Sequence, residues 1–67
     1  MGRVRLTYFW ELMDAEFGAA RAASMSRDHV FGQLGGRTVM EALEHGIDAR
    51  EVWKAVCEVY DVPPARR

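Results

Sequence analysis

Histidine, cysteine and acidic side chains are considered first, because they are the usual ligands of zinc. The chain has His29 beside Asp28, together with His45 and Cys57. Zinc sites need ligand pairs at short fixed spacings, such as two cysteines separated by two residues, and no two of these residues have such a spacing. We therefore predict no metal site and no other cofactor.

Residues for nucleophilic catalysis are not recognisable either. The chain shows no arrangement of serine, histidine and acid, and no glycine-rich phosphate loop. The segment Gly35-Gly36-Arg37-Thr38 could bind an anion through its backbone amides, but Thr38 is already expected to cap the following helix. Cys57 falls among apolar positions, where a thiol is more often an inert core residue than a nucleophile. We expect that the protein is not an enzyme.

Basic side chains indicate one alternative function, the binding of DNA. Residues 38–60 are expected to form a short helix, a turn containing Gly46 and a second helix, which is the layout of a helix-turn-helix motif. In this interpretation Arg50 and Lys54 face the DNA groove and Arg37 contacts a phosphate. Three acidic residues share the same face and would repel phosphates, namely Glu51, Glu58 and Asp61.

The composition indicates a single folded domain over residues 1–67. Hydrophobic residues make up 49% of the chain and charged residues 28%, and the formal net charge of −1 gives no general attraction to nucleic acid. A single cysteine excludes an internal disulfide and fits a reducing cytoplasm, so we expect a cytoplasmic protein. No apolar run approaches the roughly 20 residues of a membrane span, so no membrane association is expected.

Helical periodicity predicts an all-α fold, a compact bundle of four helices at about 8–17, 19–34, 39–45 and 49–60. The last two helices form an αα corner, and residues 1–5 and 64–67 are expected to be loose ends. In the first helix the apolar arc leaves Tyr8, Glu11 and Asp14 outside. In the last helix the apolar arc spans about 200°, so this helix is expected to be central.

Capping residues are expected at the start of three helices. Thr7 can cap the first helix through its hydroxyl. Thr38 with Glu41 is a capping box for the third helix, and Asp48 with Glu51 repeats this device for the fourth. The pair Gly35-Gly36 is expected to take positive φ angles in a sharp reversal of the chain.

The predicted core consists of large apolar residues on the inward sides of these helices: Phe9, Trp10, Met13, Phe17, Val30, Leu34, Leu43, Val52, Trp53, Val56 and Tyr60. Met25 falls on the polar side of the second helix, where it would contribute to an exposed apolar patch. Glu16 and Arg27 each fall inside an apolar arc, and we predict that they pair with each other. His29 is expected at the flank of the second helix, bonded to a neighbouring loop.

The chain resembles a family of short actinobacterial proteins that is known as a domain of unknown function, number 3046. The resemblance rests on RLTYFW, EFG, RDHV, LGGRT with EAL, VWKAVC and DVP, which lie between Arg5 and Pro63. It implies a small cytoplasmic bacterial protein with no established activity and no catalytic residues to carry over. Such proteins tend to be encoded near recombination genes, which implies a connection with DNA.

Together these features favour a non-enzymatic protein-interaction module. A domain of this size has a small core and gains stability by association. The expected partner is an unidentified protein or a second copy of the chain. The alternative is a helix-turn-helix-like DNA-binding protein or an accessory protein of DNA metabolism.

Overall fold

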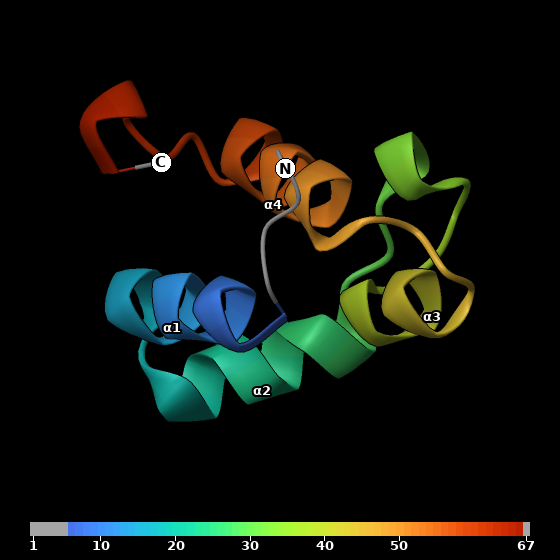
Figure 1. Ribbon diagram of the computed structural model, residues 1–67, viewed down its shortest axis with the longest axis horizontal. Coiled ribbons are helices and arrows are strands. Elements are labelled where there is room, and N and C mark those ends of the chain that lie inside the picture. The colour runs from blue at the N-terminus through green and yellow to red at the C-terminus, as the bar shows by residue number, and fades with distance from the viewer. Residues whose placement is uncertain (1–5, 67) are drawn as a thin grey trace.

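The computed structural model describes residues 6–66, which fold into four α-helices and two short 3₁₀ helices (Figure 1). The prediction of an all-α fold is confirmed. The predicted loose end at 1–5 and residue 67 lie outside the described residues. In chain order the elements are α1 (Leu6–Phe17), α2 (Ala19–Asp28), η1 (Gly32–Leu34), α3 (Val39–Glu44), α4 (Ala49–Val59) and η2 (Pro64–Arg66).

Helix α1 begins at Leu6, so the prediction that Thr7 caps this helix is wrong. Thr7 lies within the first turn, whereas an N-cap residue has a non-helical backbone. The helix ends at Phe17 and is followed by Gly18, whose φ of 85° is in the region that favours glycine. This reversal leads directly into α2, and Figure 1 shows α1 and α2 side by side and running in opposite directions.

Helix α2 ends at Asp28, six residues before the predicted end of this helix at residue 34. From His29 the backbone is extended, with φ −87° and ψ 124°. The Phe31 N–H donates to the carbonyl of Arg37 at 3.0 Å, and the Gly36 N–H donates to the carbonyl of Phe31 at 3.0 Å. A continued helix would forgo these bonds, which close a compact loop between α2 and α3.

Burial explains why the chain leaves the helix at this point. Phe31 and Leu34 are only 1% and 4% exposed, so the loop places both in the core. Val30 is 56% exposed, and its predicted place in the core is wrong. Gly35 and Gly36 have φ of 73° and 76°, as predicted for the reversal.

The predicted capping box at the start of α3 is confirmed. The Glu41 N–H donates to the Thr38 hydroxyl at 3.2 Å, and the Thr38 N–H donates to the Glu41 carboxylate at 2.9 Å. The helix ends in a Schellman motif, in which Gly46 has φ 91° and the Ile47 N–H donates to the carbonyl of Ala42 at 3.0 Å. Both ends of this short helix are therefore fixed by local bonds.

The start of α4 has an aspartate cap and not the predicted second capping box. The Arg50 N–H donates to the Asp48 carboxylate at 3.0 Å. The Glu51 N–H donates instead to the backbone carbonyl of Asp48 at 2.9 Å, and the Glu51 side chain is exposed. The acidic side chain of Glu51 in the first turn still stabilises the helix, because it lies near the positive end of the helix dipole.

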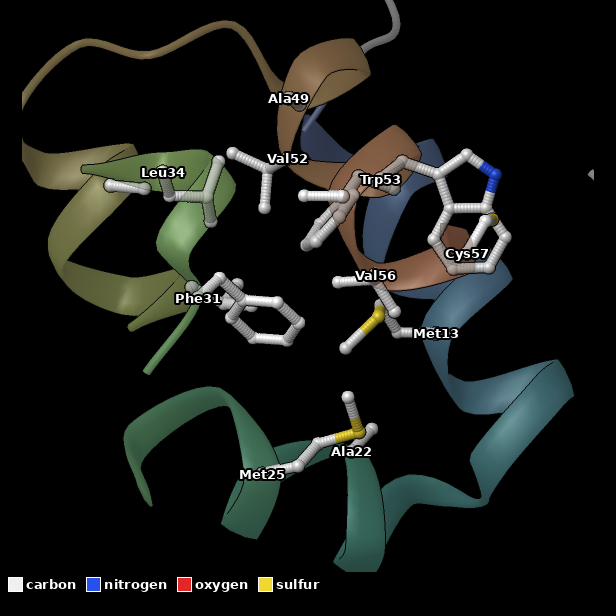
Figure 2. Packing of buried hydrophobic residues seen from close by; sticks show 14 of the residues in the cluster. Met13, Ala22, Met25, Phe31, Leu34, Ala49, Val52, Trp53, Val56 and Cys57 are labelled. Atoms are coloured by element: carbon white, nitrogen blue, oxygen red, sulfur yellow. The ribbon is translucent and has the colours of Figure 1, made fainter. Parts of the chain in front are cut away.

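Helix α4 is the centre of the core, as its wide apolar arc predicts. Its buried residues span the sides that face α1, α3 and η1, and they are Ala49, Val52, Trp53, Ala55, Val56 and Cys57. Figure 2 shows the side chains of Met13, Met25 and Phe31 directed toward Val56. Phe9, fully buried on α1, meets the Trp53 ring edge-on with centroids 6.3 Å apart.

The other predicted core residues fall into two groups. Phe9, Met13, Leu34, Val52, Trp53 and Val56 are buried as predicted. Trp10, Phe17, Leu43 and Tyr60 are partly buried and pack against that core. Met25 is 7% exposed, so the prediction of an exposed Met25 is wrong, because α2 turns its Ala22, Met25 and Ser26 side inward.

The chain after α4 is held in place, and the predicted loose end at 64–67 is wrong for residues 64–66. Asp61 takes a φ of 57°, and the Val62 N–H donates to the carbonyl of Cys57 at 3.0 Å. This is a second Schellman-type end, with an aspartate where glycine is usual. Val62 is 2% exposed, and η2 follows it.

Candidate functional site

The three residues of the DNA hypothesis do not lie on one element, because Arg37 is outside α4. Arg37 precedes α3, where its Nη1 donates to the carbonyl of Leu34 at 3.1 Å. Its Nη2 lies 3.2 Å from Nε2 of His45, and that nitrogen accepts because a guanidinium only donates. Arg37 therefore holds the loop between α2 and α3 together, a role that depends on the path of the loop and has no sequence signal.

Arg50 and Lys54 lie on the exposed strip of α4, as predicted. The strip also carries Glu51 and Glu58, both exposed. An open depression next to the strip is lined by Gln33, Glu51, Lys54, Ala55 and Glu58. The charges at this surface are mixed, and phosphates that approach Arg50 and Lys54 would also meet the carboxylates of Glu51 and Glu58.

A second open depression lies beside α3 and is lined by Gly36, Arg37, Glu41, Glu44 and His45. Three of its polar side chains already have structural roles, because Glu41 completes the capping box and Arg37 bonds to His45. Within residues 6–66 no three histidine, cysteine, aspartate or glutamate side chains gather closely enough to hold a metal ion. The depression has no arrangement of nucleophile and base.

His29, Phe31, Tyr60 and Phe17 form an aromatic cluster between α2, α4 and α1. The Nδ1 of His29 lies 3.1 Å from the Tyr60 hydroxyl, and its ring centroid lies 4.4 Å from that of Phe31. Tyr60 meets Phe17 edge-on at 5.3 Å. His29 thus bonds to Tyr60 at the end of α4 and not to a neighbouring loop as predicted, and the cluster joins three parts of the chain.

Trp53 and Cys57 lie one helical turn apart on α4. Cys57 is fully buried, which agrees with its interpretation as a core residue. The indole Nε1 of Trp53 is buried and has no hydrogen-bond acceptor among the described residues. In Figure 2 the nitrogen edge of this indole is directed away from Val56 and Met13.

Glu16 forms an ion pair with Arg66, so the predicted pair of Glu16 with Arg27 is wrong. The Arg66 Nε and Nη2 donate to the two carboxylate oxygens of Glu16 at 2.9 and 3.2 Å. This two-point hydrogen bond and the carboxylate charge raise the pKa of Arg66. Arg27 is exposed on α2, because the inward side of that helix is the side of Met25.

Large exposed apolar side chains are spread over the molecule and do not gather on one element. They are Leu6, Tyr8, Val30, Met40 and Val59, with exposed fractions between 40% and 56%. Tyr8 is 51% exposed and lies on the side of α1 that the sequence pattern left outside the core. Its neighbours along that side are the exposed acids Glu11 and Asp14.

The exposed sides of α1 and α2, two helices that contact each other, carry mostly charged residues and Tyr8. The residues are Tyr8, Glu11 and Asp14 on α1 and Arg21, Ser24 and Arg27 on α2, and all are exposed. We refer to these residues as the α1–α2 surface. The sequence pattern placed the α1 members correctly but missed the α2 members, because it extended α2 to residue 34 and so misjudged its inward side.

Comparisons with known proteins place the chain in a family. A Mycobacterium tuberculosis protein, whose name proposes a role in an envelope-preserving system, is 44% identical over 36 residues, which are 54% of this chain and 13% of that protein. No solved structure matches the chain, and no helix within residues 6–66 is long and apolar enough to cross a membrane. The family model described as a protein of unknown function, DUF3046, matches residues 4–65. The chain therefore belongs to the DUF3046 family.

Proposed function

We propose that the protein is a non-enzymatic protein-interaction module that binds its partner through the α1–α2 surface. The observation that carries this proposal is an exposed Tyr8 on two packed helices whose exposed charged side chains have no ion-pair partner within residues 6–66, namely Glu11, Asp14, Arg21 and Arg27. Tyrosine and arginine are enriched in protein interfaces and at their energetic centres.

The mycobacterial relative supports the same interpretation. The match covers 13% of that protein, so a stretch similar to this chain forms a small part of a longer polypeptide. This arrangement fits a domain that acts through contacts with other polypeptide segments. Because each depression is open and its polar groups are engaged or mixed in charge, neither favours a reaction over binding.

DNA binding is the second candidate, since α3 and α4 keep the helix-turn-helix layout and Arg50 and Lys54 are exposed. Two features count against it. Arg37 is held by Leu34 and His45, and the exposed strip of α4 has as many acidic as basic groups.

Photo-crosslinking in an actinobacterial host tests the proposal. A photoreactive amino acid at position 8 is expected to give a discrete protein adduct. The same amino acid at position 58, on the outer strip of α4, is the control and should not give that adduct. The proposal fails if position 8 yields no protein adduct while purified protein binds duplex DNA with an affinity that falls with salt and is lost in Arg50→Gln/Lys54→Gln.

A further inference from the structure

The α1–α2 surface consists of two rows with opposite charge. In each row the residues are three positions apart, so they follow successive turns of the same exposed side. The α1 row is Tyr8, Glu11 and Asp14, and the α2 row is Arg21, Ser24 and Arg27. The rows have the same length and spacing, and one is acidic while the other is basic.

The charges of these rows are not paired within the part of the chain that the structure describes. Glu11, Asp14, Arg21 and Arg27 form no ion pair with any described residue. Ser24 donates to Asp28 at 3.3 Å, which engages the one acidic residue at this end of α2. The surface therefore offers both signs of charge to a partner.

We infer that the partner of this surface is a second copy of the same chain, with α1 of each copy facing α2 of the other. This inference rests on the proposed function and names its partner. A surface that carries both an acidic and a basic row is complementary to itself under a two-fold rotation, which is the requirement for a symmetric dimer.

The hairpin geometry gives the matching register. Because α1 and α2 run in opposite directions from Gly18 (Figure 1), a two-fold axis parallel to the helices places α1 antiparallel to α2 of the partner. Positions equally far from Gly18 are then level with each other. Counted from Gly18, each residue of the α1 row is one position further away than its counterpart in the α2 row. This difference corresponds to about 1.5 Å of helix rise.

The facing chemistry follows from this register. Glu11 comes opposite Ser24 of the partner, between the two arginines of that row. Asp14 is level with Arg21 of the partner and Tyr8 with its Arg27, and arginine side chains are long enough to span the lateral offset. The contacts are charge pairs and a cation–π contact, so association is expected to be modest in strength and to weaken with salt.

Charge exchange tests this dimer. One variant, Arg21→Glu/Arg27→Glu, makes both rows acidic, and another, Glu11→Arg/Asp14→Arg, makes both rows basic. Sedimentation analysis over a concentration series should show self-association of the wild type. Each variant alone should associate at least about tenfold more weakly, because like charges then face each other. An equimolar mixture of the two variants should recover association, since every acidic row then meets a basic row.

The matched control is Glu51→Arg/Glu58→Arg, which makes the same charge change on α4 and should associate like the wild type. Circular dichroism establishes that each variant is folded. The inference is overturned if the wild type is monomeric at all concentrations, if the reversed variants associate as strongly as the wild type, or if the mixture does not recover association. A position-8 adduct with a different protein would also overturn it but would leave the proposed function intact.

Discussion

The N-terminal half of the molecule, α1 and α2 with the loop that follows, differs from the C-terminal half in how its helices are bounded. Helix α2 begins after Gly18 with no side-chain cap and ends at His29 with only a backbone bond. In the C-terminal half Thr38 and Asp48 cap α3 and α4 through their side chains. Tertiary burial thus decides where α2 ends, whereas local bonds decide where α3 and α4 begin.

The largest loss of stability is expected from a substitution in the loop that ends α2. Phe31→Ala should cost about 3–5 kcal/mol, because it removes a buried aromatic ring and leaves a cavity. A core of this size provides only about 3–5 kcal/mol in total, so the variant should be largely unfolded at room temperature. Urea denaturation followed by circular dichroism measures the loss.

The neighbouring residue provides the control for this prediction. Val30 is 56% exposed, so Val30→Ala should change the free energy of unfolding by less than about 0.5 kcal/mol. If Val30→Ala were as costly as Phe31→Ala, the helix would continue through residue 30 as the sequence pattern suggested, and the contrast between the two halves would disappear.

The capping residues test the C-terminal half. Thr38→Ala should cost about 0.5–2 kcal/mol, because it removes the hydroxyl that accepts from the Glu41 amide. Thr7→Ala should cost less than about 0.5 kcal/mol, since Thr7 is exposed within the first turn of α1. Thermal unfolding of both variants makes the comparison, and equal losses would mean that α1 begins after Thr7.

The two helix ends in the C-terminal half should respond with opposite signs. Gly46→Ala places a side chain at a φ of 91° and should destabilise by about 1 kcal/mol. Asp61→Gly relieves a φ of 57° and should stabilise by about 0.5–1 kcal/mol. Asp61→Asn keeps a side chain of the same size but removes its charge. It therefore separates the effect of backbone strain on stability from the effect of the carboxylate charge on the helix dipole. A loss of stability in Asp61→Gly would contradict this account.

These differences explain how far the sequence predicts the fold. The Thr38–Glu41 capping box and the Gly35-Gly36 reversal depend on residues close in the chain, so their spacing is sufficient to predict them. Helix α4 was also predictable, because its apolar arc is wide and contrasts with its charged strip. The end of α2 was not, since an alanine-rich helix gives little contrast and the burial of Phe31 depends on helices that come later in the chain.

The candidate surface was predictable only in part, for the same reason. Tyr8, Glu11 and Asp14 fall outside a clear apolar arc, so the sequence pattern identifies them as exposed. Arg27 was assigned to an inward side because α2 was extended too far. The partner of Glu16 was missed because Arg66 lies far along the chain and meets α1 only after α4 has returned to it.

The smallest loss of stability is expected from removing the ion pair of Glu16 and Arg66, which connects the two halves. Arg66 is exposed, so Arg66→Gln should reduce stability only slightly, and high salt should remove the difference from the wild type. Because Glu16 raises the pKa of a side chain that is already strongly basic, this contribution should be constant from neutral to mildly alkaline pH. Lys54→Gln removes the same charge from α4 and is the control. A double-mutant cycle with Glu16→Gln measures the coupling, and additive effects would show that this ion pair does not hold the C-terminal turn in place.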